Sequence, residues 1–130
     1  ILGLKVFVNR EPLLTNFDFL KAVLFLRHRP IPFDSFMELI KDHLRQGIAC
    51  VIDLPAPEVA PLVGPIMDHV IFVYGIDDKY LYVIDTWQLP TFEYQRASPD
   101  ENKFLMRFSL DQVKKRWDKG GMLWCFEKSP

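Results

Sequence analysis

The sequence is poor in several residue types that mark particular classes of protein. Its 130 residues include two cysteines, three histidines and six glycines. Two cysteines cannot build the disulfide framework of a small secreted domain, and the scattered glycines form no phosphate-binding loop. The formal net charge at pH 7 is −1, and no block of Lys and Arg occurs. This charge balance argues against a nucleic-acid-binding surface.

Long apolar runs and metal-binding spacings are also absent from the sequence. No apolar run reaches the roughly 18 residues that cross a membrane, and no signal-peptide pattern opens the chain. No His-x-x-x-His or Cys-x-x-Cys spacing of a zinc site occurs. His28 and His43 have no second ligand one helical turn away, so we expect both at the surface. The sequence therefore predicts no metal and no cofactor, and it leaves the cellular compartment open.

What is present is a composition that supports a folded core. Hydrophobic residues make up 49% of the chain, and this length favours a single domain over residues 1–130. The later strands follow one another closely in the chain, which favours an α+β fold with a mostly antiparallel sheet and helices packed to one side. We predict strands at Leu4–Val8, Ile48–Leu54, His69–Tyr74, Tyr80–Asp85, Lys103–Ser109 and Met122–Glu127, and helices at Thr15–Pro30, Phe33–Gly47 and Leu110–Gly121.

Two of the predicted helices carry end signals. In the helix at 33–47, Ser35 and Glu38 have the spacing of a capping box, and Gly47 has the position of a helix-ending glycine. In the last helix, Ser109 is followed three residues later by Gln112, which is the same N-terminal signal.

The most informative segment is DHVIFVYGIDDKYLYVIDTW, residues 68–87. Two apolar runs rich in Val, Ile and Tyr flank a Gly/Asp turn, which predicts a β-hairpin. If Tyr74 lies opposite Tyr80, His69 faces Asp85, with Cβ atoms roughly 4.5–5.5 Å apart. At this separation an imidazole–carboxylate hydrogen bond can form, which is the bond that fixes the tautomer of a catalytic histidine.

That interpretation depends on the strand register. A slip by one residue would put His69 and Asp85 on opposite faces of the sheet. The alternative is an ordinary pair at the ends of two strands, which satisfies its own polar groups or meets water. Trp87, two residues after the aspartate, is expected in the core; as a second interpretation it forms a wall of the site.

A histidine and its orienting carboxylate need a nucleophile, and the sequence offers no suitable one. Cys50 and Cys125 both lie within apolar, strand-like runs, where burial raises the pKa of a thiol. Ser35 and Ser109 are better explained as helix caps. We therefore expect neither cysteine to act as the nucleophile that the histidine and its carboxylate would serve.

Four motifs in order resemble a known family. They are FDSFMELIKDHLRQGIACVIDL, then HVIFVYGIDD, then VIDTW, and finally SLDQVKKRW. Their order and spacing resemble the C-terminal half of a peptidase C39-like domain, a branch of the papain-like cysteine peptidase fold. The resemblance covers roughly residues 33–117.

The resemblance implies roles for two residues. His69 would be the general base and Asp85 the residue that orients it. In the family a nucleophilic cysteine opens an N-terminal helix in a D-C-G context, and that motif is not among the 130 residues. We therefore expect the cysteine and its helix upstream of residue 1. Thr86 stands where the family has proline.

Several functions stay open on this basis. The first is a cysteine peptidase acting on a peptide or protein. The second is an inactive papain-like module that binds a peptide or protein, with the proline-rich segment 55–67 lining its groove. A lecithin:retinol acyltransferase-like arrangement would need Cys125 at a helix start, and transglutaminase-like enzymes share the Cys–His–Asp order. A domain lacking its N-terminal segment would also expose apolar surface, so self-association is a further expectation.

Overall fold

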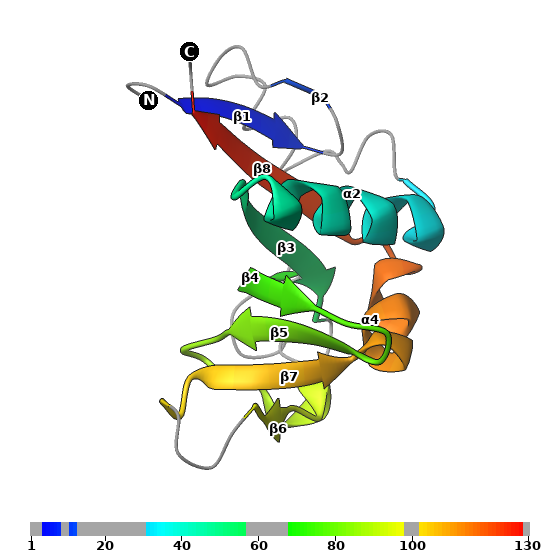
Figure 1. Cartoon of the computed structure of the whole chain (residues 1–130). Helices are drawn as coiled ribbons and strands as arrows, with labels where there is room; N and C mark the ends of the chain where they lie inside the picture. Colours follow the sequence, from blue (N-terminus) through cyan, green and yellow to red (C-terminus); the bar gives the residue numbers. More distant parts are fainter. Residues whose placement is uncertain (1–3, 9–10, 13–30, 57–67, 98–101, 129–130) are drawn as a thin grey trace.

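The computed structural model of the chain describes residues 4–8, 11–12, 31–56, 68–97 and 102–128. Within these ranges, eight strands form one sheet in the order β2-β1-β8-β3-β4-β5-β7-β6, and all of the pairings are antiparallel (Figure 1). The strands are β1 Leu4–Val8, β2 Glu11–Pro12, β3 Ala49–Pro55, β4 Asp68–Ile76, β5 Tyr80–Ile84, β6 Gln95–Arg96, β7 Leu105–Ser109 and β8 Met122–Lys128.

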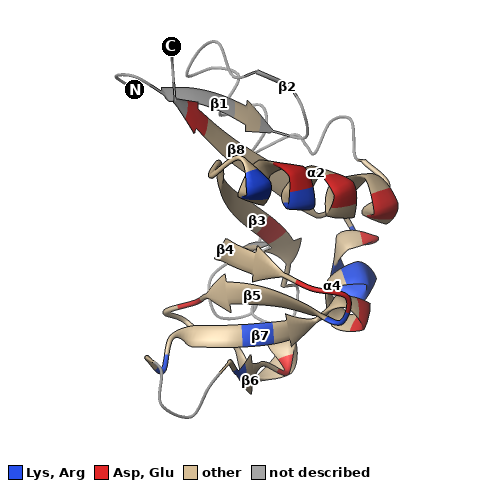
Figure 2. Ribbon diagram, in the orientation of Figure 1, with Lys and Arg blue, Asp and Glu red and all other residues tan. Residues whose placement is uncertain are grey.

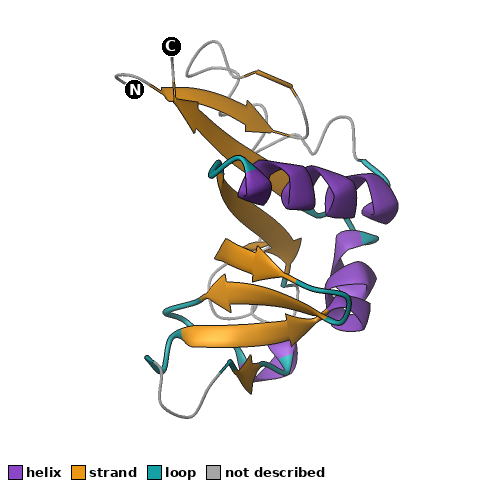
Figure 3. Cartoon of the chain, viewed as in Figure 1, coloured by secondary structure: helices purple, strands orange, loops and turns teal. Residues whose placement is uncertain are grey.

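The described helical segments are α2 (Phe33–Arg45), α4 (Leu110–Trp117) and the short 3-10 helix η2 (Pro90–Phe92) (Figure 3). Strands and helices thus combine as the predicted α+β class with an antiparallel sheet. The predicted helix at 15–30, with His28, lies outside the described residues, as do residues 57–67 of the proline-rich segment. In the part of the chain that is described, no helix is long and apolar enough to cross a membrane.

Alternation along the strands gives the sheet two different faces. One face carries the main core, and α2 and α4 cover it with buried apolar side chains. The core residues of this face are Cys50, Ile52 and Leu54 of β3, Ile71 and Val73 of β4, Leu81 and Val83 of β5, Met106 and Phe108 of β7, and Leu123 and Cys125 of β8; the helices add Phe36, Ile40, Val113 and Trp117.

The opposite face is also apolar, and part of it is open to solvent. Direct cross-strand pairs place five apolar residues in one row over five strands: Trp124, Val51, Phe72, Ile84 and Leu105. Trp124 is buried, whereas Phe72 is 41% exposed. Among the described residues, Lys, Arg, Asp and Glu lie mainly on the helices and the connecting segments, and few lie on the strands (Figure 2).

The helix ends agree with the predicted signals in part. Ser109 caps α4, because its side chain accepts a hydrogen bond from the backbone N–H of Gln112 at 3.3 Å. Gly47 follows the end of α2 with a φ of +72°, a left-handed conformation that favours glycine. The predicted capping box of Ser35 is wrong. The helix begins at Phe33 after an extended Pro32, so Ser35 lies inside the first turn and caps nothing.

Trp117 joins α4 to the segment before α2. Its ring stacks on Phe36 with centroids 4.0 Å apart, and its indole N–H donates to the carbonyl of Ile31 at 2.8 Å. The neighbouring Arg116 donates to the carbonyls of Pro55 and Thr91. These contacts hold α4 against the end of β3 and the η2 segment, close to the candidate site.

Candidate functional site

The hairpin of β4 and β5 contains an irregularity that decides which side chains meet. Near the turn, Ile76 pairs with Leu81, but the register shifts at Tyr74, between Val73 and Gly75, in a β-bulge. If the pairing near the turn continued without the bulge, His69 would share a face with Ile84 and not with Asp85. The extra residue at the bulge puts His69 on the same face as Asp85.

The predicted pairing of Tyr74 with Tyr80 is therefore wrong. On the far side of the bulge, Val73 pairs with Val83, which differs from the predicted register by two residues. A displacement of two keeps every side chain on its predicted face, because side chains alternate along a strand. As a result, His69 and Asp85 are diagonal neighbours on one face, and long side chains still meet at that separation.

The two side chains form a short, buried hydrogen bond. Nε2 of His69 lies 2.6 Å from Oδ2 of Asp85. The two residues are only 4% and 3% exposed. His69 is placed by β4, where it pairs with Leu54 of the neighbouring β3, and Asp85 follows the last residue of β5. The structure thus brings both predicted site residues together.

The carboxylate of Asp85 is held by three hydrogen bonds. Besides His69, the hydroxyl of Tyr94 donates to Oδ2 at 2.6 Å. The backbone N–H of Trp87 donates to the other oxygen, Oδ1, at 3.0 Å. The backbone is held too, because the Asp85 N–H donates to the carbonyl of Phe104. Both oxygens are therefore fixed in orientation by groups from the segment that follows β5.

These contacts determine the chemistry that His69 offers. An ionised carboxylate only accepts hydrogen bonds, so Nε2 of His69 carries the proton and donates to Asp85. Nδ1 then holds a lone pair and is the nitrogen that can accept a proton; among the described residues it has no hydrogen-bond partner. Two aromatic rings meet the imidazole edge-on, Phe92 at 5.1 Å and Trp87 at 5.8 Å between centroids. The rings limit rotation of the imidazole, so Nδ1 keeps one direction.

Tyr94 is a site residue that sequence reasoning missed. It is partly buried, and both burial and the hydrogen bond to Asp85 raise the pKa of its hydroxyl. The chain reaches it through η2 and then Glu93, whose φ of 53° is left-handed. The only signal in the sequence is a weak one: Phe92 and Tyr94 alternate with polar residues in a segment that leaves the sheet.

A depression of about 500 Å³ lies mainly on the open face of the sheet, and its lining also reaches His69 and Asp85, whose side chains lie on the helix-covered face at the ends of their strands. Trp87 is 47% exposed there, so the prediction that it belongs to the core is wrong. Its backbone N–H holds the Asp85 carboxylate in the turn after β5, and its ring meets the imidazole of His69 edge-on. The lining residues are Val51, His69, Val70, Phe72, Ile84, Asp85, Thr86 and Trp87.

Neither cysteine reaches the dyad. Cys50 lies four residues before Leu54, the strand partner of His69, which corresponds to about 13 Å along β3. Cys125 lies directly opposite Cys50 on β8, farther from β4. Among the described residues, no group of three or more His, Cys, Asp or Glu is placed to hold a metal ion.

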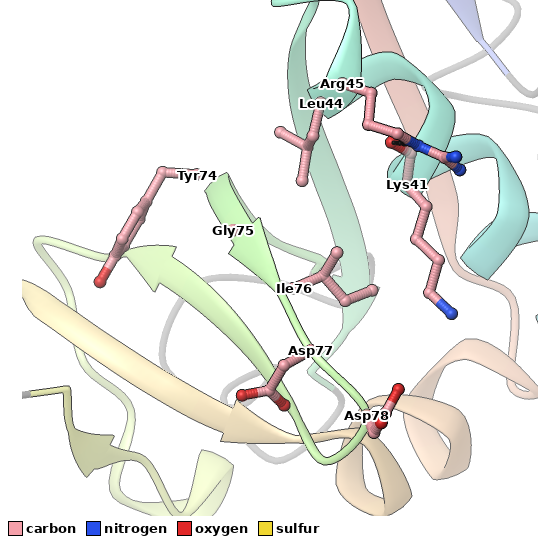
Figure 4. Close-up of a pocket in the computed structure, with 8 residues that line it drawn as sticks. All are labelled: Lys41, Leu44, Arg45, Tyr74, Gly75, Ile76, Asp77 and Asp78. Carbon is pink, nitrogen blue, oxygen red and sulfur yellow. Dashed lines mark hydrogen bonds between the residues drawn. The ribbon is translucent and has the colours of Figure 1, made fainter.

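A second depression, of about 530 Å³, lies at the other end of β4 (Figure 4). Figure 4 shows Lys41 of α2 reaching toward the turn that holds Asp77 and Asp78. Asp77 is a turn residue, because its side chain accepts hydrogen bonds from the backbone N–H groups of Lys79 and Tyr80. The lining of this depression includes no histidine or cysteine, so it offers no imidazole base like that of His69 and no thiol.

Comparison with known proteins gives no further indication. No family model matches the chain, and neither does any curated protein or solved structure. A function for the chain is therefore inferred from the geometry of the site and from the motif order.

Proposed function

We propose that this chain is the His- and Asp-bearing part of a papain-like cysteine peptidase of the peptidase C39-like type. His69 is the general base, and Asp85 orients it. The observation that carries the proposal is the buried hydrogen bond of 2.6 Å between Nε2 of His69 and Oδ2 of Asp85, which leaves Nδ1 to accept a proton. The nucleophile in this proposal is a cysteine from outside the 130 residues.

In the proposed reaction the thiol gives its proton to Nδ1 of His69. The thiolate attacks the carbonyl carbon of a peptide bond, and Asp85 stabilises the imidazolium that forms. Nδ1–H then donates its proton to the leaving amine as the C–N bond breaks, which leaves a thioester. Water hydrolyses the thioester after giving a proton to Nδ1, and the thiol is regenerated.

The hydrogen bonds around Asp85 support this role. Tyr94 and the Trp87 N–H occupy carboxylate positions that would otherwise be open to water or to other rotamers. A fixed carboxylate holds the imidazole in one tautomer and one orientation. Amide substitution of this carboxylate in a Ser-His-Asp enzyme lowers turnover by about 10⁴-fold because the wrong tautomer forms.

The depression whose lining reaches the dyad supports a peptide as the substrate. Its walls are mainly apolar, and the one acid in its lining, Asp85, has both oxygens engaged. Val70 and Phe72 of β4 are 59% and 41% exposed toward it. An uncharged, apolar side chain next to the reacting peptide bond would bury this surface.

A second candidate function is a papain-like module that binds a peptide or protein without cleaving it. Two observations favour it. Both cysteines of the chain are buried in the sheet away from the dyad. The apolar depression is a binding surface that needs no nucleophile. We expect no peptide hydrolysis by the 130 residues alone and no reaction with thiol-directed peptidase probes.

The test of the first function is steady-state cleavage of a peptide by the natural gene product. His69→Ala should lower kcat/KM by about 10²–10⁴-fold, the typical contribution of a general base. Asp85→Asn should lower it by up to about 10⁴-fold. His43→Ala is the matched control, since His43 lies on α2 and contacts neither residue of the dyad. Wild-type rates in the His69→Ala variant would contradict the proposal.

The second function has a different readout. Binding of an apolar peptide to the 130-residue chain can be followed by fluorescence, because Trp87 is exposed and lines the depression. Phe72→Glu should weaken binding, whereas Tyr74→Glu should not, because Tyr74 lies two residues along the same strand and outside the lining. Binding with no cleavage by the gene product would support the module and contradict the peptidase.

A further inference from the structure

The two cysteines of the chain face each other in the middle of the sheet. Cys50 of β3 and Cys125 of β8 are direct Cα partners across the antiparallel ladder. Their Sγ atoms lie 3.8 Å apart, both thiols are free, and both are buried. They are separated by 75 positions in the sequence, so only the pairing of β3 with β8 brings them together.

We propose that Cys50 and Cys125 are an oxidation site, at which a peroxide converts the thiol pair into a disulfide that links β3 to β8. This inference is independent of the proposed peptidase function, because neither cysteine contacts the dyad.

The backbone geometry allows this bond. Directly opposed residues of an antiparallel pair have Cα atoms about 4.5–5.5 Å apart, and disulfides occur at Cα separations of roughly 4.4–6.8 Å. The sulfur atoms need to approach by only about 1.7 Å to reach a bond length of about 2.05 Å. Side-chain rotation within the existing strand pairing provides most of this movement.

A small cavity leads to one of the two thiols. Its volume is about 190 Å³, and Cys125 is part of its lining. His43 and Glu127 add polar groups; the two side chains lie 3.7 Å apart, and His43 donates from Nδ1 to the carbonyl of Leu39. His43 is thus half-buried, contrary to the predicted surface position. A peroxide molecule is small enough for this space and hydrogen-bonds with such polar groups.

The oxidation balances in two steps. The thiolate of Cys125 attacks the peroxide, which forms a sulfenic acid and releases one water after proton transfer. The thiolate of Cys50 then attacks the sulfenic sulfur, forms the S–S bond and releases a second water. Two thiols thus lose two protons and two electrons, and one peroxide becomes two waters.

The contact between the thiols affects how fast the first oxidation step can be. The hydrogen bond with Cys50, together with burial, raises the pKa of Cys125, so the first step is slow. In the reduced pair the same hydrogen bond lowers the pKa of Cys50, although burial alone would raise it. We therefore expect the disulfide to form slowly with hydrogen peroxide.

The disulfide would lie at a strand pairing that joins two parts of the sheet. β3 is the neighbour through which β8, and with it β1 and β2, joins the other described strands. A disulfide between Cys50 and Cys125 would therefore link the two parts of the sheet covalently. It would also close a long loop in the unfolded chain, and such bonds raise the free energy of unfolding.

The experiment treats the folded 130-residue chain with hydrogen peroxide and measures intact mass and free thiols. We expect a loss of two hydrogen atoms, a fall from two free thiols to none, and full reversal by dithiothreitol. The midpoint of thermal unfolding should rise by about 5–15 °C in the oxidised protein. Cys50→Ser and Cys125→Ser are the controls, and neither should gain this stability with peroxide.

The wild-type measurement is sufficient if a variant does not fold. A chain that keeps its circular dichroism spectrum and both free thiols after prolonged peroxide treatment would overturn the proposal. Addition of oxygen atoms without loss of two hydrogens, or disulfides formed only between chains, would overturn it as well.

Discussion

At the scale of single residues, the candidate site is organised by one carboxylate. Asp85 receives hydrogen bonds from His69, Tyr94 and the backbone of Trp87. Burial of a carboxylate costs free energy unless hydrogen bonds satisfy its oxygens. The three donors meet this requirement and fix the histidine at the same time, so the same contacts stabilise the fold and determine the tautomer.

Tyr94→Phe tests this arrangement by its pH dependence. At pH 7 the variant should lose about 1–3 kcal/mol of unfolding free energy, because a buried charged acceptor loses a donor. The raised pKa of Tyr94 means that the fold favours the protonated phenol. That contribution is complete below the pKa of about 10 of an unfolded tyrosine and declines as the pH rises above it.

Urea unfolding between pH 7 and 11 measures this effect. Wild-type stability should fall more steeply above pH 10 than that of Tyr94→Phe. Tyr82→Phe is the matched control: its hydroxyl also has a raised pKa, from a hydrogen bond to Asp77, but it is exposed. Parallel curves for wild type and Tyr94→Phe would show that Tyr94 does not bind Asp85 in this way.

At the scale of elements, the bulge in β4 sets the composition of the site. The ladder between β3 and β4 ends at the pair Cys50 and Val73, just before the bulge at Tyr74. Tyr74 is thus an extra residue in the ladder between β4 and β5, and it lies outside the ladder between β3 and β4. Removing it would restore regular pairing and leave His69 on the face of Asp85.

This leads to a prediction about two single-residue deletions in β4. Deletion of Tyr74 should keep the His69–Asp85 hydrogen bond. Deletion of Phe72 should break it, because residues 68–71 then slip by one and His69 turns to the other face. The measurement is the ¹H NMR signal of the Nε2 proton, which a short imidazole–carboxylate hydrogen bond shifts far downfield. Loss of the signal in both deletions, or in neither, would contradict the role given to the bulge.

At the scale of the whole molecule, α2, α4 and β8 meet around Trp117. Gly121 precedes β8 at a position where a Cβ atom would lie 2.4 Å from the Trp117 ring. The ring has no free space to move into, because it stacks on Phe36 and donates to Ile31. The close approach of backbone and ring therefore requires glycine.

Gly121→Ala should lower the free energy of unfolding by about 1–3 kcal/mol through overpacking. Trp117→Phe removes part of the ring, so the double variant should be less destabilised than the sum of the two single variants. Gly47→Ala is the control, because a Cβ there meets nothing within 4 Å and its cost arises from the backbone alone. Chemical denaturation measures all of these variants. Strict additivity of Gly121→Ala and Trp117→Phe would contradict the proposed clash.

The sequence by itself determined most of the longer described strands and helices, and it predicted that His69 and Asp85 share a face of one hairpin. Apolar runs rich in Val, Ile and Tyr around a Gly/Asp turn mark β4 and β5, and helical spacing marks α2, because these signals depend on neighbours in the chain. His69 and Asp85 were identifiable since each ends an apolar run of one hairpin. The α+β class follows from the order of such elements.

Only the tertiary structure decided which side chains meet. The register of the hairpin depends on a bulge that no periodicity predicts, and Tyr94 reaches Asp85 only after the chain has turned through η2. The contact of Cys50 with Cys125 likewise requires β8 to return beside β3. Each of these contacts joins residues on different elements, and its free energy depends on the packing of the whole sheet.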